Sequence, residues 1–378
     1  MKVEQRRWTT GGGWEPAAAT LGSTAQLVLV FGGREALEAA ERLAEVKRAY
    51  PKAHLFGCST AGEIHGTRVD DDSISVTAVE FARTRVHGAH VQLGGSGTSR
   101  QSGEALARSL PKDDLVHVVV LSDGTNVNGS ELVQGMLKEL PAGVQVTGGL
   151  SGDGARFQRT LVFFDTPPQA KQIAAIGLYG RSLKVGYGSL GGWDPFGPER
   201  LVTRSAGNVL YELDGQPALA LYEKYLGDYA AGLPGTGLLF PLSVRAKDSD
   251  RAVVRTILGI DESRQSMTFA GDMPEGAYAQ LMKANFDRLI DGAHGAAQTS
   301  QASLGSGSPE LAILISCVGR KLVLKQRTEE ELEAVQQVLG ASTTMTGFYS
   351  YGEICPAAPN ANCELHNQTM TITTFAER

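Results

Sequence analysis

The chain has 378 residues, of which 42% are hydrophobic and 20% charged, and its formal net charge is -6. This composition excludes a disordered chain, and an acidic balance without a Lys/Arg cluster argues against nucleic acid as a partner. The apolar runs are much shorter than the ~18 residues that span a bilayer, and the N-terminal residues lack the apolar core of a secretory signal. Because four cysteines make no disulfide framework, we expect a cytoplasmic α/β protein without a membrane partner.

The first predicted unit follows a segment that we expect to be a loose N-terminal arm, residues 1–24. The apolar run at residues 26–31 is typical of a buried strand. An amphipathic helix is predicted over residues 35–50, where Pro51 ends it, and a short strand over residues 54–56 follows.

The same order of strand, helix and strand recurs twice. The second copy has its strand at 116–121, its helix at 130–140 and its second strand at 144–147, and the third copy has its strand at 311–316 and its helix at 328–339. A repeated order of elements is more informative than single shared residues in a chain with 46 glycines. The sequence therefore predicts three related strand–helix–strand units.

Each copy leads into a glycine-rich loop that ends in an acid, namely Glu63, Asp153 or Glu353. Parallel strand–helix–strand units bind ligands in the loops beyond the carboxyl ends of their strands. Glycine lets the backbone approach a ligand closely, and nearby side chains offer hydroxyls. The hydroxyls belong to Ser59, Thr60, Ser151, Tyr349 and Tyr351. Two interpretations stay open: the loops hold a small polar ligand, or the glycines only close turns while the acids cap helices.

The segments between the copies mostly alternate like antiparallel strands. We predict strands within 73–92, 160–189 and 253–269, short helices over 206–213 and 217–226, a linker over 191–198 and a helix over 276–292. The predicted fold class is therefore α/β, with repeated strand–helix–strand units, additional mixed or antiparallel strands, and two lobes.

Cys58 follows a strand and is the one candidate nucleophile for an enzyme acting on a small polar substrate. The spacing identifies no histidine partner for it, and the segment is not the nucleophile elbow of hydrolases. A buried, inert cysteine is the favoured interpretation, so an enzyme is the alternative and not the main prediction.

Cys355, Cys363 and His366 have the spacing C-x7-C-x2-H. Zinc sites prefer a closer first pair and a fourth ligand, which makes a metal here a minority interpretation. A non-covalent haem needs only one axial histidine in an apolar pocket, which the sequence neither shows nor excludes. His366 is the best-placed candidate for a metal or haem ligand.

Two motifs together resemble the FIST family. Residues 54–64, HLFGCSTAGEI, resemble the signature of the FIST N-terminal part, and residues 347–354, GFYSYGEI, with residues 365–371, LHNQTMT, resemble the end of the FIST C-terminal part. The resemblance covers about residue 25 to the end. It implies a FIST N-terminal domain over residues 25–198 and a FIST C-terminal domain over residues 199–378.

The resemblance implies a stand-alone sensory protein in bacterial signal transduction, not an enzyme. Its ligand would be an amino-acid-like metabolite or, as in some stand-alone members, haem b that senses nitric oxide. Its partner would be a histidine kinase or a cyclic-dinucleotide signalling enzyme. Carried over by position, the expected ligand contacts are Cys58, Ser59, Thr60, Glu63, Tyr349, Tyr351, Glu353, His366 and Asn367, beside Ser151 and Asp153 from the second loop. We expect the ligand to lie between the two lobes and to favour one lobe orientation.

Overall fold

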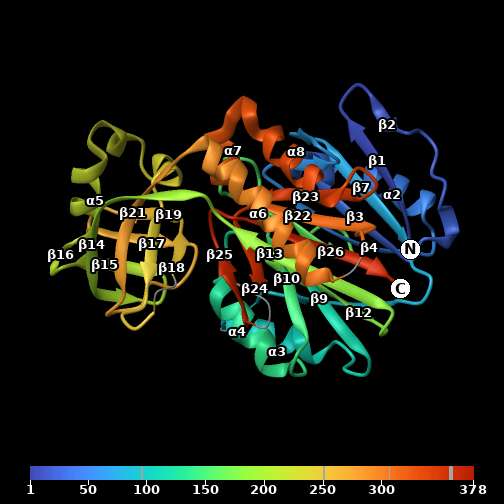
Figure 1. The fold of residues 1–378 in the computed structure, drawn as a ribbon, viewed down its shortest axis with the longest axis horizontal. Coiled ribbons are helices and arrows are strands. Elements are labelled where there is room, and N and C mark those ends of the chain that lie inside the picture. The colour runs from blue at the N-terminus through green and yellow to red at the C-terminus, as the bar shows by residue number, and fades with distance from the viewer. Residues whose placement is uncertain (95–96, 250–251, 306, 357–360) are drawn as a thin grey trace.

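The computed structural model describes residues 1–94, 97–249, 252–305, 307–356 and 361–378. Helices and mixed sheets alternate along the chain and form two lobes, which confirms the predicted α/β class (Figure 1). The larger lobe, here called the body, contains three sheets of six strands each. The smaller lobe, here called the satellite lobe, is built by residues 193–284 and appears in yellow and olive in Figure 1.

The three sheets of the body share one arrangement. Each has a parallel pair of buried strands, then two antiparallel strands on the side of the first member of that pair. In the first sheet these are β3 (Leu27–Gly32), β4 (His54–Ser59), β7 (Ile74–Glu80) and β1 (Lys2–Thr9). In the second they are β9 (Leu115–Ser122), β10 (Gln145–Leu150), β12 (Gln172–Tyr179) and β8 (Arg85–Gln92). In the third they are β22 (Leu311–Cys317), β23 (Thr344–Ser350), β26 (Met370–Glu377) and β13 (Leu183–Leu190).

One glycine on the second parallel strand fixes the register between the repeats. In every sheet a side chain at this position would overlap the carbonyl oxygen of the neighbouring strand. The pairs are Gly57 with Val30, Gly148 with Val120, and Gly347 with Leu314. The three predicted copies therefore superimpose at these glycines, and the acid of the second loop, Asp153, falls one position before the acids of the other two.

After each glycine–acid loop the chain crosses to a different sheet. β5 (Glu63–His65) pairs with β23, β11 (Val162–Phe164) pairs with β4, and β24 (Gly352–Pro356) pairs with β10. Each sheet thus receives at least one strand from another repeat, and backbone hydrogen bonds join the three repeats into one body. The C-terminal repeat lies with the two N-terminal repeats and not in a lobe of its own.

Helices cover the outer faces of the sheets. They are α1 (Arg34–Glu38), α2 (Ala40–Ala49), α3 (Ser99–Arg108), α4 (Gly129–Glu139), α6 (Phe286–Leu304), α7 (Val318–Leu324) and α8 (Thr328–Leu339). Asn128 caps α4 by accepting hydrogen bonds from two backbone N–H groups of its first turn. Among the described residues, no helix combines the length and the apolar character that a membrane crossing needs.

The satellite lobe has its own sheet and its own apolar core. Its strands are β14 (Trp193–Ala206), β15 (Val209–Leu213), β16 (Gln216–Pro217), β17 (Leu242–Arg245), β18 (Ala252–Arg255), β19 (Ile257–Asp261), β20 (Ser266–Phe269) and β21 (Tyr278–Ala284). The helix α5 (Ala218–Leu226) and the short helices η2 (Gly227–Gly232) and η3 (Gly235–Leu239) complete it. The chain enters through β14, which takes up residues 193–198 of the predicted linker by pairing with β21, and leaves through β21 into α6.

Three predictions about elements were wrong. The expected loose arm contains β1, which pairs with β7 along its length, and β2 (Gly13–Glu15), which closes a hairpin on β1. β1 is a mostly half-buried strand rich in charged residues, so it lacks the apolar run of a central strand. The predicted helix over 206–213 is β15, and the predicted helix over 276–292 is β21 followed by α6. In both cases pairing within the satellite sheet overrides the helical spacing of the apolar residues.

Candidate functional site

The structure brings the three glycine–acid loops together at the centre of the body. The first and third loops exchange backbone hydrogen bonds, from Ala61 N–H to the Tyr349 carbonyl and from Tyr349 N–H to the Gly62 carbonyl, both 2.8 Å. Gly152 N–H donates to the Ser59 carbonyl at 3.0 Å, which joins the first and second loops. The loops converge because each one connects a strand of its own sheet to the edge of another.

Glu63 and Glu353 hold equivalent positions and make equivalent contacts. The Glu63 carboxyl accepts hydrogen bonds from the Thr60 hydroxyl and, at 2.8–2.9 Å, from the hydroxyl and N–H of Ser73. The Glu353 carboxyl accepts from the Ser350 hydroxyl at 2.6 Å and from Thr369 N–H and hydroxyl at 3.0–3.1 Å. Each acid therefore clasps its loop to the strand that follows within the same repeat.

Both clasping acids are buried, with 1% exposure for Glu63 and 0% for Glu353. Burial raises the pKa of Glu63 to about 7 and that of Glu353 to about 8, although the hydrogen bonds act in the opposite direction. Neither acid caps a helix, as the structural interpretation expected, but both hold loops through hydrogen bonds. Their expected role as ligand contacts stays a prediction.

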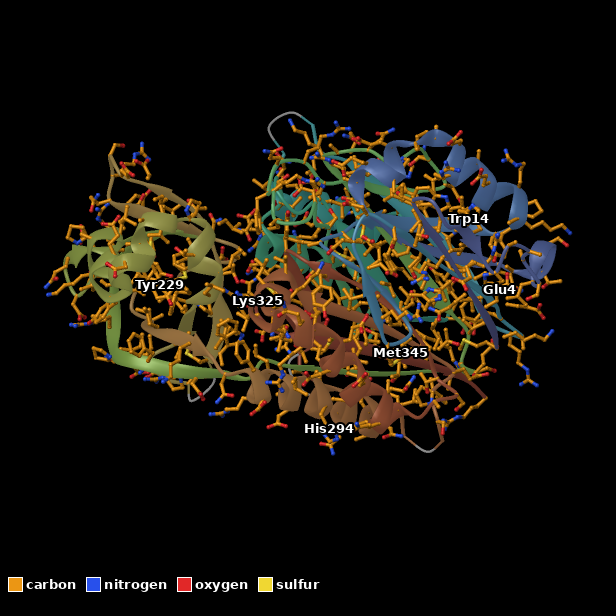
Figure 2. The ribbon with its side chains drawn as sticks, turned by 90° about the horizontal axis from the view of Figure 1, so that it is seen from above. Glu4, Trp14, Tyr229, His294, Lys325 and Met345 are labelled. Carbon is orange, nitrogen blue, oxygen red and sulfur yellow. The ribbon has the colours of Figure 1, made fainter. Side chains whose placement is uncertain are left out.

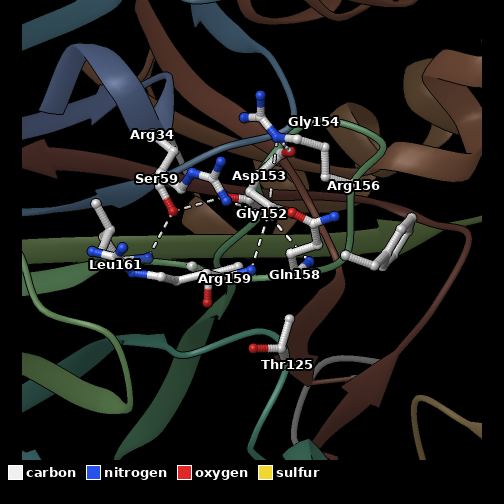
Figure 3. A network of polar contacts seen from close by, with 12 residues as sticks. Arg34, Ser59, Thr125, Gly152, Asp153, Gly154, Arg156, Gln158, Arg159 and Leu161 are labelled. Carbon is white, nitrogen blue, oxygen red and sulfur yellow. Dashed lines mark hydrogen bonds and ion pairs between the residues drawn. The ribbon is translucent and has the colours of Figure 1, made fainter. Parts of the chain in front are cut away.

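The second repeat departs from this pattern, as Figure 3 shows. Gly154 occupies the position of the clasping acid, while Asp153 turns toward Arg34, whose Nη1 lies 3.1 Å from its Oδ2. The same carboxyl accepts N–H bonds from Gln158 and Arg159, and its other oxygen accepts from the Tyr351 hydroxyl. The acid of the second loop therefore holds the segment directly after it, residues 158–159, and Gly154 to Arg156 line a cavity.

A cavity of about 560 Å³, here called the loop cavity, lies beside this departure. All three repeats line it, through Ala61, Asp71, Asp72, Gly154, Ala155, Arg156, Val318, Lys321, Leu322, Lys325 and Thr328. A smaller cavity of about 280 Å³ shares Ala155, Arg156 and Leu322 with it and reaches Leu238 and Ile257 of the satellite lobe. Loop ends of the three repeats and the edge of the second lobe thus meet around two neighbouring cavities.

The charged side chains of the loop cavity differ in their pairing. Lys321 forms an ion pair with Asp71 and donates to the Ala61 carbonyl at 2.9 Å. Arg156 pairs with Glu35, outside the cavity lining. Lys325 and Asp72 form no ion pair within the described part of the chain, and Lys325 lies at the junction of the two lobes (Figure 2). One unpaired cation and one unpaired carboxylate therefore face a mostly apolar wall.

None of the predicted site residues lines the loop cavity. Ser59 and Ser151 bond to backbone carbonyls of the loops, and Tyr349 donates to Glu331 at 2.6 Å. Asn367 lies between the lobes and accepts from Thr256 N–H at 3.4 Å. The sequence identified the loops that surround the hollow, but their signature residues hold the loops in place. Asp72 and Lys325 carried no signal in the sequence, because exposed charges next to turns are common.

Cys58 is 0% exposed, and burial with the neighbouring Glu63 raises the pKa of its thiol. All four cysteines are free and buried. Since the thiolate is the reactive form, we expect the native protein to react with none of its thiols and the unfolded protein with four. Titration with DTNB, before and after addition of guanidinium, measures this. A single thiol that reacts rapidly in the native protein, but is absent from the Cys58→Ser variant, would favour the alternative of an enzyme with Cys58 as its nucleophile.

The surroundings of His366 do not fit the haem or metal that the sequence allowed. Its Nε2 lies 2.9 Å from the Cys355 carbonyl, so the nitrogen that would bind iron already has a partner. The ring is 8% exposed and lines none of the cavities beside the loops. No group of three metal-ligating side chains occurs among the residues the structure describes. We derive no step from a haem or a metal.

Comparison of the sequence with known families gives the class of this protein. Sequence models of the FIST N domain and the FIST C domain match residues 26–216 and 218–356. The chain belongs to the FIST family, as its motifs predicted. FIST domains are sensory domains of signalling proteins, which supports a ligand-binding sensory role. The two matches meet inside the satellite lobe, so they do not coincide with the lobes.

Curated relatives are similar to this protein in sequence over 65–94% of the chain. An uncharacterised protein of Mycobacterium tuberculosis is 24% identical over 94% of this chain and 92% of its own length. An uncharacterised protein of Methanocaldococcus jannaschii is 23% identical over 65% of this chain and 51% of its own length.

Two solved structures align along nearly the whole chain at low similarity. A cyanuric acid hydrolase from A. caulinodans has a TM-score of 0.38 and 8% identity, covering 100% of this chain and 99% of its own. A chorismatase has a TM-score of 0.35 and 12% identity, covering 99% of this chain and 98% of its own. We draw no functional conclusion from likeness at this level.

Proposed function

We propose that this protein senses a small, polar, amino-acid-like metabolite in the loop cavity and passes the signal to a separate protein. The observation that carries the proposal is the meeting of all three repeats around one hollow of about 560 Å³, beside the second lobe. That volume lies within the range of small-molecule sites in proteins.

The charges of the loop cavity suggest the chemistry of its ligand. A carboxylate would pair with Lys325, and an ammonium group would pair with Asp72, the two lining charges without an ion pair in the described residues. The apolar wall formed by Val318 and Leu322 would accept the carbon chain. The other cation and acid from the same two segments, Lys321 and Asp71, neutralise each other in an ion pair.

The signal follows from how close the loop cavity lies to the satellite lobe. A ligand that extends from the loop cavity past Ala155 and Leu322 into the smaller cavity would reach Leu238 and Ile257 of that lobe. A ligand that contacts both lobes favours the lobe orientation in which those contacts form, by as much as its affinity differs between orientations. The surface offered to a histidine kinase or a cyclic-dinucleotide enzyme would change with that orientation. In this proposal the protein binds its ligand and does not transform it.

Replacing Lys325 by asparagine tests the site. We expect at least a tenfold loss of affinity for an amino-acid ligand, because a charge-assisted hydrogen bond contributes roughly 1.5–3 kcal/mol. Lys325 has a φ of 52° and a ψ of -115°, a conformation of type II′ turns in which asparagine is common, so the melting temperature should hold. Thermal shift with the standard amino acids identifies a ligand, and calorimetry measures its affinity.

The matched control is Lys171→Asn. Lys171 is also exposed and its backbone φ, 58°, is also positive, but it does not line the loop cavity. It should bind the ligand as the unaltered protein does. The proposal fails if no amino acid shifts the melting temperature, or if both variants lose the same affinity.

A further inference from the structure

A second cavity, of about 380 Å³, lies between the lobes on a different side of the satellite lobe. The body lines it from α4 and from β25 (Cys363–His366), and the satellite lobe lines it from β17, β18 and the segment before β21. We call it the Arg255 cavity. Its lining consists of Ser130, Val133, Gln134, Val244, Ala246, Ser249, Val253, Arg255, Asp272, Pro274, Ala277, Cys363, Glu364 and Leu365.

Among the described residues, Arg255 is a buried cation without a direct ion pair. It is 7% exposed, and its Nε donates to the Asp272 carbonyl at 3.2 Å, while Nη1 donates to the carbonyls of Leu365 at 3.0 Å and Val254 at 3.4 Å. Within the part of the chain that the structure describes, Nη2 has no hydrogen-bond partner. A buried guanidinium held only by carbonyls still lacks a counter-charge at contact distance, which is costly.

A second polar group of the same cavity also lacks a partner. The hydroxyl oxygen of Ser130 is buried and forms no hydrogen bond with any described residue. Two carboxyl groups line the cavity as well, and Asn128 holds that of Asp272 with a hydrogen bond of 2.9 Å across the lobe boundary. The remaining lining is mainly apolar. The cavity therefore combines one buried guanidinium, one unsatisfied hydroxyl and an apolar wall.

We propose that the Arg255 cavity binds a small carboxylate with an apolar body, whose carboxyl group accepts hydrogen bonds from Nη2 of Arg255 and from the Ser130 hydroxyl. Planar guanidinium and carboxylate groups match in geometry, and the pair is strongest where water is excluded. Val133, Val253 and Leu365 would contact the apolar body. The ligand would bridge α4 of the body and β18 of the satellite lobe.

The site is separate from the loop cavity, so the two proposals fail independently. Arg255, Thr256 and Ile257 follow one another along the chain, and the first lines the Arg255 cavity while the third lines the hollow next to the loop cavity. A carboxylate at Arg255 would therefore act on the same lobe boundary from another side. This gives the sensor a second input.

Calorimetry with 4-methylpentanoate and L-leucine tests the proposal. The two probes share an apolar body and a carboxylate, and only leucine adds an ammonium group, which Asp272 and Glu364 would attract. We expect at least one probe to bind the full-length protein. Arg255→Lys should weaken that binding at least tenfold, because lysine cannot reproduce the fork of the guanidinium. Tighter binding of L-leucine than of 4-methylpentanoate would show that Asp272 and Glu364 attract the ammonium group.

A second variant and a control keep the result interpretable. Ser130→Leu fills the cavity from an unsatisfied position and should remove binding with little change in melting temperature. Arg264→Lys alters an arginine of the same lobe that does not line the cavity, and it should bind normally. Absence of binding by both probes at 10 mM, or equal binding by Ser130→Leu and the unaltered protein, would overturn the proposal.

Discussion

Replacing Glu331 by alanine is expected to destabilise the protein by about 3–5 kcal/mol, the usual cost of removing one partner of a buried ion pair. Glu331 and Arg320 are both 0% exposed, and their closest atoms lie 2.7 Å apart. The same carboxyl accepts hydrogen bonds from the hydroxyls of Ser316 and Tyr349. Alanine would therefore leave a buried cation and two buried hydroxyls without their acceptor.

The position of Arg320 explains why the loss should affect the whole body. Its guanidinium also donates to the carbonyls of Gly191 and Leu289, each at 2.7 Å, so it joins the entry to the satellite lobe with α6 and α8. Urea unfolding followed by circular dichroism measures the free energy. Glu333→Ala, an exposed position on the same helix, should change it by less than ~0.5 kcal/mol. Similar free energies of unfolding for the two variants would contradict the expected contribution of the Arg320–Glu331 ion pair to stability.

Glu353→Gln is expected to make the protein more stable in alkaline solution. The folded-state pKa of Glu353 is raised to about 8 from its ordinary value of 4.5, so the folded protein holds a proton that the unfolded chain has released. This group contributes stability at low pH and loses it as the pH rises through about 8. Glu63, with a pKa of about 7, acts in the same direction. The loss amounts to a few kcal/mol for shifts of this size.

Melting temperatures measured from pH 5 to pH 9 test this prediction. The melting temperature of the unaltered protein should fall across this range, and that of Glu353→Gln should fall less, since the neutral amide has no proton to lose in the buried site and its oxygen can still accept from Ser350. The control Glu333→Gln should follow the unaltered protein. A steeper fall for Glu353→Gln would mean that the ionised carboxylate stabilises the loop. Loss of ligand binding without loss of stability would instead support the role that the sequence suggested for Glu353.

The sequence predicted the repeated units well because their signals are local. Apolar runs such as residues 311–316 and the helical stripe over 328–339 depend on neighbours close in the chain, and both elements are present as β22 and α8. The family motifs were equally readable, and the sequence models of both FIST domains match. The helix predicted over 276–292 failed in its first half because pairing of β21 with β14 and β17 decides that segment.

The candidate sites were predicted less well, for a reason that Arg255 illustrates. Within the predicted strand over 253–260, Val253, Arg255 and Ile257 share one face, and an arginine among inward-facing apolar residues was a usable signal of a buried cation. What the sequence could not supply was the opposite wall. That wall comes from α4 and β25, more than 100 residues away on either side of the chain.

The amino-acid sequence alone determined the three repeats, their glycine–acid loops and the family, because each of these depends on residue types within a few tens of positions. Only the tertiary structure decided that β5, β11 and β24 cross between sheets. It also decided that Glu63 and Glu353 are buried and hydrogen-bonded within their own repeats, and that the unpaired charges lie elsewhere. The reason is physical: whether a polar group is free to bind a ligand depends on the hydrogen-bond partners and the burial that distant segments provide.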